Sequence, residues 1–400
     1  MKNKILLLMA LVFVIEITAQ NTIITSGGES RVITTGMPFG LIAPDARAAG
    51  MGDMGVATSV DAFSQHWNSS KYAFSETKSG FGFSYTPYLK KLVNDIGIGY
   101  LSYFNRIDER SAFGVSLKYF GLGEIEFVTD EFSEASIQKP NELSLDVSYA
   151  LKLTDQFAMS VAMRYLRSDL RLNYDNSDAS AASTFGVDIS GYYQSEEEAY
   201  SDFNGRWRAG FAIQNVGPKF KYDDAGPDNF QPTNLRLGAG FDFIFDDYNK
   251  ISVTAEVAKL LVPTPPVYGF VDTDGDEFQD TDEPTILLEG KDPDVNFLSG
   301  IFQSFGDAPD GFSEEMKEFT WALGAEYLYQ DSFAFRAGYF NESEDKGARK
   351  FLALGAGFKA NVVNLDLSYL FSASKVQSPI EGTLRFSITL NIGEGEYVEY

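Results

Sequence analysis

The residues with the clearest potential for chemistry lie in one acidic stretch, DTDGDEFQDTDE, at residues 272–283. Its candidate metal ligands are Asp272, Asp274, Asp276, the main-chain carbonyl of Phe278, Asp280 and Glu283. This spacing matches the D-x-D-x-D…E pattern of oxygen ligands in an EF-hand-type calcium loop. Alternating aspartates also create a charge density that a hard cation relieves. The stretch therefore predicts a Ca²⁺ site, and a solvated acidic loop without metal is the alternative.

Two features depart from the calcium-loop pattern. Glu277 stands where the pattern has glycine, although Gly275 lies just before it. Prolines also surround the stretch, at Pro263, Pro265, Pro266 and Pro284. Because proline disrupts helices, the loop is predicted to lack the flanking helices of an EF-hand.

The remaining composition excludes most catalytic chemistry. The chain has no Cys and a single His, His66, so disulfides, thiolate nucleophiles and metal sites built on several histidines are excluded. No G-x-S-x-G, P-loop or metalloprotease motif is present. We therefore predict that the protein is not an enzyme and that His66 is a packed structural residue.

The first residues of the chain point to an exported protein, and its net charge argues against a nucleic-acid partner. Lys2 and Lys4 precede an apolar run at 5–15 and small residues at 17–20, the order of a cleavable signal peptide. An uncleaved anchor is the alternative, but a helix that crosses a bilayer needs roughly 20 apolar residues. The formal net charge of −25 argues against binding to nucleic acid, which favours positive charge.

Positions beyond this segment alternate between apolar and polar residues. In LSLDVSYALK (143–152), Leu145 and Val147 share one face while Asp146 lies on the other, as in a β-strand. About fourteen such segments recur, at 80–88, 96–104, 112–120, 142–151, 157–166, 184–192, 205–213, 234–243, 251–258, 319–329, 332–339, 351–358, 362–371 and 384–392. Their number and length predict an all-β fold, a transmembrane antiparallel β-barrel with its apolar positions facing lipid. A soluble sandwich is the alternative.

The connections between these segments alternate in length. Short ones are typical of periplasmic turns and long ones of extracellular loops, and the longest connection covers 259–318. The stretch QSEEEAYSDF (194–203) is an exception, because it is longer than a periplasmic turn should be.

A segment rich in Ala, Gly and Met, at 33–77, precedes the first predicted strand. A barrel with more than about eight strands has a lumen too wide for its own side chains to fill. We therefore predict that this segment is a hatch folded into the lumen, with a periplasmic linker as the alternative. The predicted division is a signal peptide at 1–20, an N-terminal segment and hatch at 21–77, the barrel at 78–392 and a tail at 393–400.

The stretch LIAPDARAAGMGDMGVATSVDAFSQHWNSSKYAF (41–74) resembles the N-terminus of the PorV family, outer-membrane proteins of the type IX secretion system that are similar to FadL-type fatty-acid channels. GKDP at 290–293 and SGIFQSFGDAPDGFSEEMKEF at 299–319 extend the resemblance over essentially the whole mature chain. One departure is Asn68-Ser69-Ser70, where FadL-like proteins commonly have Asn-Pro-Ala.

The resemblance implies a 14-stranded outer-membrane barrel with a hatch and without a catalytic centre. It implies three protein partners: the type IX translocon barrel, the C-terminal domains of its cargo, and a PorU-like sortase complex that attaches cargo to the cell surface. Outer-membrane lipid surrounds such a barrel. A FadL-like transporter of long-chain fatty acids or other hydrophobic small molecules is the alternative function.

The candidate partner-binding residues lie in the longest loop. They are Phe297, Leu298, Ile301, Phe302 and Phe305, which stand beside many acidic residues. Apolar anchors with a charged rim are typical of a protein-binding patch.

Overall fold

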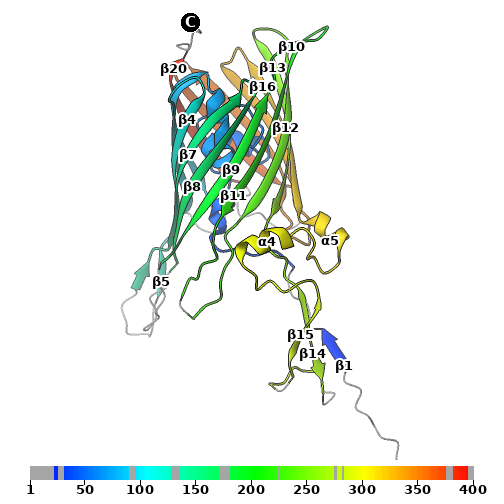
Figure 1. Cartoon of the computed structure of the whole chain (residues 1–400). Coiled ribbons are helices and arrows are strands. Elements are labelled where there is room, and N and C mark those ends of the chain that lie inside the picture. The colour runs from blue at the N-terminus through cyan, green and yellow to red at the C-terminus, as the bar shows by residue number, and fades with distance from the viewer. Residues whose placement is uncertain are drawn as a thin grey trace, which may run out of the picture.

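The computed structural model describes residues 22–25, 31–89, 95–127, 136–170, 181–223, 225–273, 277–281, 283–374 and 382–394. The predicted signal peptide and residues 395–400 of the predicted tail lie outside this part of the chain. Within it, fourteen long antiparallel strands form a closed barrel (Figure 1). The predicted fold class and strand number are confirmed.

Each predicted segment coincides with one of the long strands. In chain order they are β2 (Thr77–Pro87), β3 (Ile96–Arg106), β4 (Ser111–Leu122), β7 (Asn141–Thr154), β8 (Phe157–Asp169), β9 (Ala182–Gln194), β11 (Asn204–Val216), β12 (Asn234–Ile244), β13 (Asn249–Leu260), β16 (Phe319–Tyr329), β17 (Phe333–Asn341), β18 (Lys350–Ala360), β19 (Val363–Ser372) and β20 (Leu384–Glu394). Neighbours in this order pair with each other, and β2 pairs with β20 to close the barrel. Closure leaves no open strand edge, which hydrocarbon does not tolerate.

The two rims of the barrel differ, as the connection lengths predict. β3–β4, β7–β8, β12–β13, β16–β17 and β18–β19 are joined by short turns at one rim, where β2 begins and β20 ends. This rim is therefore periplasmic. The long hairpin predicted as an exception also lies there, and it contains the short strand β10 (Glu198–Ala199). The opposite, extracellular rim carries the long connections (Figure 1, bottom).

Side chains alternate across the barrel wall in the predicted register. Leu145 and Val147 are exposed on the outside, whereas Asp146 between them is buried on the inside. In β19, Asp366 is likewise buried between the exposed Leu365 and Leu367. The outer face is thus apolar and the inner face polar. None of the helices in the described residues is long and apolar enough to cross a membrane.

The hatch segment lies inside the barrel (blue in Figure 1). It consists of short helices joined by turns: η1 (Pro38–Leu41), α2 (Ala46–Gly50), α3 (Ser64–Trp67) and η2 (Ser69–Phe74). α2 contacts β17, β18, β19 and β20, while η2 contacts β7, β8 and β9 on the opposite wall. The hatch backbone approaches the wall so closely that the wall needs glycine there: a Cβ on Gly338 of β17 would lie 2.0 Å from the carbonyl carbon of Met51.

The extracellular loops carry the remaining elements. The loop between β13 and β16 contains the hairpin β14 (Val267–Asp272) and β15 (Thr285–Glu289), followed by helices α4 (Phe297–Gln303) and α5 (Phe312–Lys317). β5 (Ile125–Phe127) and β6 (Ser136–Gln138) form a separate hairpin between β4 and β7. β1 (Thr22–Thr25), from the N-terminal segment, pairs with β14.

Arginine substitutions at adjacent positions of β20 test this register. Ile388 faces outward halfway along the strand, and Thr389 faces a lumenal cavity of about 800 Å³ that Asp366 also lines. We expect Ile388→Arg to cost roughly 2–4 kcal/mol, because it places a charge in hydrocarbon, and Thr389→Arg to cost much less. Unfolding of the barrel in lipid vesicles by denaturant measures both. Equal losses of stability would contradict the register.

Candidate functional site

Polar and charged side chains gather in two places, the interface between hatch and barrel wall and the extracellular rim. The interface between hatch and wall closes the lumen. The extracellular rim carries the surfaces that a partner outside the cell can reach. The two are described in turn, because the hatch positions the N-terminal segment that continues to the rim.

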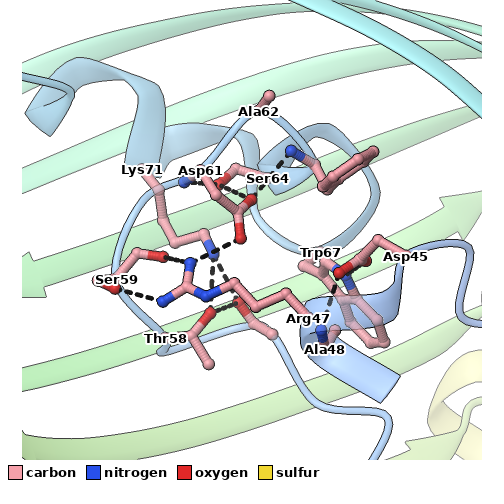
Figure 2. A network of polar contacts seen from close by, with 12 residues as sticks. Asp45, Arg47, Ala48, Thr58, Ser59, Asp61, Ala62, Ser64, Trp67 and Lys71 are labelled. Carbon is pink, nitrogen blue, oxygen red and sulfur yellow. Dashed lines mark hydrogen bonds and ion pairs between the residues drawn. The ribbon is translucent and has the colours of Figure 1, made fainter. Parts of the chain in front are cut away.

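The hatch is held together by buried polar contacts (Figure 2). Asp45 caps α2 by accepting a hydrogen bond from the Ala48 N–H at 2.8 Å, and it accepts a second from the Trp67 indole at 2.8 Å. Lys71 donates to the Gly55 carbonyl at 2.9 Å and to the Thr58 hydroxyl at 3.1 Å. These contacts fix the fold of a segment that contains few regular elements.

Arg47 links the hatch to the barrel wall. Its guanidinium donates to Asp61 within the hatch at 2.7 Å and to Glu326 of β16 at 2.9 Å. Glu326 in turn accepts from Arg336 of β17, which also donates to Asp366 at 2.7 Å. Buried charges are stable only when they are paired in this way, so the network specifies where the hatch sits.

Other wall residues bind the hatch backbone. Glu256 of β13 accepts hydrogen bonds from the Gly55 and Val56 N–H groups at 2.8 and 2.9 Å. Lys118 of β4 donates to the carbonyls of Phe39, Gly40 and Ile42. The polar inner face of the barrel therefore satisfies backbone groups that the irregular hatch cannot pair internally.

Asn68 stabilises the turn at which the sequence departs from Asn-Pro-Ala. Its side-chain oxygen accepts from the Ser70 N–H at 3.2 Å, and its amide donates to the carbonyls of Val56 and Gly191 at 2.9 Å. The side chain thus ties the turn both to the hatch and to β9, so a proline is not required to hold it.

His66 is a packed residue, as the sequence predicts. It is buried, with its ring 4.8 Å from that of Trp67 and 6.2 Å from that of Tyr100 in edge-to-face geometry.

The periplasmic half of the lumen contains the cavity of about 800 Å³. Its lining includes Arg106, Lys152, Lys359 and Asp331 from the strand ends, and Arg47 and Phe63 of the hatch form part of its wall. The extracellular half is filled instead by apolar packing of Met37 and Phe39 against the residues Ile98, Phe120, Leu166 and Phe220. A charged lining of this kind does not favour an apolar ligand.

Helices α4 and α5 present apolar side chains at the extracellular rim. Leu298, Phe302 and Phe305 are exposed at 52, 78 and 51%, and Phe312 and Met316 of α5 add to this surface. The other two predicted anchors, Phe297 and Ile301, are half-buried. α4 faces the protein at Gly300, where a Cβ would lie 2.8 Å from the Phe230 ring. We call the five exposed residues the rim patch.

A buried ion-pair network holds the rim patch in place. Lys259 at the end of β13 pairs with Glu318 and, at 3.3 Å, with Glu315. Lys346, from the loop between β17 and β18, pairs with Glu314 at 2.7 Å and with Glu318 at 3.0 Å. All five side chains, those of Lys259, Lys346, Glu314, Glu315 and Glu318, are buried. We call these residues the rim network. The acidic residues predicted to form an exposed rim are therefore, at these positions, internal partners of lysines.

Two carboxyl groups at the edge of this network have shifted pKa values. Burial raises the pKa of Asp307 to about 6, and the carboxylates of Glu315 and Glu318 add to the rise. Burial also opposes ionisation of Glu314, but hydrogen bonds from Lys346, the Asp310 N–H and Arg31 outweigh it and hold its pKa below the usual range. At neutral pH Glu314 is therefore ionised, and its charge depends on Lys346 and Arg31.

The predicted calcium loop connects β14 to β15. Glu283 accepts from the Thr273 N–H at 2.6 Å, which brings the last candidate ligand beside the first, and Asp272 accepts from the Glu277 N–H at 3.2 Å. Asp274 and Asp276 lie outside the described residues. Among the residues that the structure describes, which include Asp272, Asp280 and Glu283, no group of three or more acidic or His side chains is placed to hold a metal. The Ca²⁺ site stays a prediction.

Sequence reasoning missed the rim network. The run SEEMKE at 313–318 indicates only an acidic segment, and Lys346 lies in another loop. Lys259 offered only a weak signal, because alternation along β13 puts it on the face opposite Thr254 and Glu256. The pairing itself depends on the three-dimensional proximity of two loops.

Comparisons with known proteins agree with this architecture. The family model described as type IX secretion system protein PorV matches residues 25–267, more than half of the chain. No curated protein sequence matches the chain. A solved structure described as the TodX deltaS2S3 mutant monoaromatic hydrocarbon channel is 11% identical, with a TM-score of 0.53, and the match covers 87% of this chain and 98% of that one.

Two further structures have similar barrels. The deltaS2 mutant of the same channel is 12% identical, with a TM-score of 0.50 and coverage of 88% and 97%. A Pseudomonas aeruginosa FadL homologue is 12% identical, with a TM-score of 0.46 and coverage of 91% and 100%. At this identity the likeness concerns the fold alone.

Replacing Lys259 tests the rim network. Lys259→Met removes the lysine partner of Glu315 and leaves Glu318 with Lys346 alone. Loss of one partner from a buried ion pair typically costs about 3–5 kcal/mol. We expect the 261–318 loop to become sensitive to protease while the barrel stays folded. Lys350→Met is the control, because the partner of Lys350, Glu344, is 76% exposed and exposed pairs contribute about 1 kcal/mol or less. Equal protease resistance of both variants would contradict the role of the network.

The calcium prediction is tested by calorimetry on the purified protein. We expect Ca²⁺ to release heat on binding and Asp274→Asn and Glu283→Gln each to weaken it, because each substitution removes a charged oxygen ligand. Glu283→Gln keeps an acceptor for the Thr273 N–H, so loss of heat reports the ligand and not the hairpin. Absence of calcium-dependent heat in the parent protein would rule the site out.

Proposed function

The chain belongs to the PorV family of type IX secretion system proteins, and we propose that it receives the C-terminal domains of secreted cargo at the outer face of the membrane. In this proposal the cargo arrives from the translocon barrel and leaves for a PorU-like sortase complex that attaches it to the cell surface. The protein itself performs no catalysis. It acts as an outer-membrane receptor beside the translocon.

The observation that carries this proposal is the rim patch. Leu298 and Phe302 of α4 and Phe312 of α5 expose large apolar side chains outside the cell, where leaving them in water is unfavourable. Aromatic residues and Met are enriched in protein interfaces, and a transient complex needs on the order of 1,000 Å² or somewhat less. The rim network supports the patch, because a surface held rigid by buried ion pairs loses little entropy on binding.

The closed lumen supports the same function. Cargo held outside the cell must not open a leak through the barrel that receives it. The hatch is tied to the wall by Arg47, Glu256 and Lys118, and its first residues fill the extracellular half of the lumen. The barrel thus serves as a sealed support for its extracellular loops.

A FadL-like transporter of long-chain fatty acids or other hydrophobic small molecules is the second candidate. It is favoured by the shared fold with the solved structures described as hydrocarbon channels. The charged lining of the lumenal cavity and the acidic outer loops disfavour it, because a fatty acid brings an apolar chain and a negative charge.

Substitutions on α4 distinguish the two functions. We expect the double variant Leu298→Ser, Phe302→Ser to reduce surface-attached cargo several-fold without changing fatty-acid uptake, because it removes apolar anchors and leaves Lys259 and its partners intact. Cargo on intact cells is measured with antibodies, and uptake with a labelled long-chain fatty acid.

The matched control is Ile107→Ser with Tyr248→Ser, two exposed apolar residues on periplasmic turns. The control should secrete cargo normally. Normal secretion together with reduced uptake in the α4 variant would contradict the proposed function and favour the transporter.

A further inference from the structure

The N-terminal segment does not end inside the lumen. Residues 31–76 run through the whole height of the barrel, from the rim patch to the first residue of β2 at the periplasmic rim. Strand β1 precedes this segment and pairs in antiparallel register with β14, from Thr22 opposite Asp272 to Thr25 opposite Gly269. Because β14 belongs to the longest extracellular loop, β1 lies outside the barrel on the extracellular side (Figure 1, bottom).

The path of this segment through the extracellular rim is fixed by side chains of the loops. Arg31 forms ion pairs with Asp310 at 2.6 Å and with Glu314 at 2.9 Å. Lys346, which also pairs with Glu314, donates to the Arg31 carbonyl at 3.2 Å. The rim network that holds α5 therefore holds the N-terminal segment as well.

Below the rim, the segment fills the extracellular half of the lumen. The Gly36 N–H donates to the Phe230 carbonyl at 2.9 Å, and the Met37 N–H donates to the Tyr222 hydroxyl at 2.8 Å. The side chains of Met37 and Phe39 are completely or almost completely buried. These contacts hold the segment from Arg31 to Phe39 between the extracellular rim and the rest of the hatch.

Strand β1 is the edge of a three-stranded sheet in the order β1-β14-β15. Proteins usually protect such edges with lysine, proline or a bulge, because unpaired N–H and C=O groups pair readily with another strand. β1 has the sequence TIIT, which contains none of these and favours extended structure. Ile23 is 59% exposed. The edge is thus suited to strand addition.

We propose that β1 is displayed at the cell surface and that its free edge accepts an extended strand from the cargo domain. The choice of cargo as partner rests on the proposed function, whereas the location of β1 does not. The hairpin beside β1 is acidic, with Asp272, Glu277, Asp280, Glu283 and Glu289. The strand that binds is therefore one flanked by lysine or arginine, since opposite charges favour the encounter.

The location is tested by labelling single cysteines on intact cells. The chain has no natural Cys, so each introduced thiol is unique. Ile23→Cys is the test, Ser313→Cys on the exposed surface of α5 is the extracellular control, and Ser201→Cys in the long periplasmic hairpin is the opposite control. The reagent is a polyethylene-glycol maleimide too large to pass through porins.

We expect Ile23→Cys to react on intact cells as completely as Ser313→Cys, and Ser201→Cys to react only after the membrane is disrupted. Reaction of Ile23→Cys only after disruption, or no reaction at all, would overturn the surface location. Because neither result involves cargo, this experiment is independent of the proposed function.

The acceptor edge is tested by the binding of a purified cargo C-terminal domain to the full-length protein in lipid nanodiscs. Replacing residues 22–25 with Gly-Ser-Gly-Ser keeps the length and removes the strand, and we expect the dissociation constant to rise roughly tenfold or more, the loss of about 1.4 kcal/mol. An unchanged dissociation constant would contradict the binding of cargo to the β1 edge, and it would not contradict the proposed function. Failure of the parent protein to bind cargo would overturn the proposed function and this choice of partner together.

Discussion

The hydrocarbon core of a bilayer supplies no hydrogen-bond partner, so a chain that crosses it in strands must pair every backbone N–H and C=O with another strand. This requirement closes the sheet at the β2–β20 pairing and gives each strand one face toward lipid and one toward the lumen. The period-two pattern of the sequence follows from it, because Val147 meets lipid while Asp146 beside it does not. Closure also creates a lumen, and the hatch and its contacts with the wall fill part of that lumen.

A closed barrel of fourteen strands encloses more space than its own side chains fill. Where the inner wall is charged, an apolar plug would leave its buried charges without partners. The hatch solves this problem with small residues that allow close approach and with charges complementary to the wall, such as Arg47 opposite Glu326. A plug of this kind is specific to one barrel, since each buried charge has a defined partner.

The same pairing continues at the extracellular rim. Lys259 and Lys346 hold three glutamates of the α5 region inside the loop, and Arg31 brings the N-terminal segment to the same place. One set of ion pairs thus joins the barrel end, the longest loop and the hatch segment. The apolar residues left outside this network, chiefly Leu298, Phe302 and Phe312, are free to meet a partner. This arrangement separates a rigid membrane support from the exposed apolar surface that we propose as the site of partner binding.

Much of this architecture is determined by the sequence alone. Alternation at positions such as 143–152 predicts each strand and its lipid face, because neighbouring residues of a strand point to opposite sides whatever their partners are. The alternating lengths of the connections predict which rim is periplasmic. The small-residue segment at 33–77 predicts a hatch, because a barrel of this size requires filling. The type of the α4 residues and their place in a long loop also predict a partner-binding role for them, which stays a prediction.

The tertiary structure alone decided which charges meet. Glu315 and Glu318 look like members of a solvated acidic rim, but folding places them against Lys259, more than fifty residues earlier in the chain. It also decided that the N-terminal segment passes through the lumen to pair β1 with β14, about 250 residues later. Periodicity records the face on which a side chain lies, and it carries no information about a partner far away in the chain. Such pairings arise only when closure of the barrel fixes the distances between its loops.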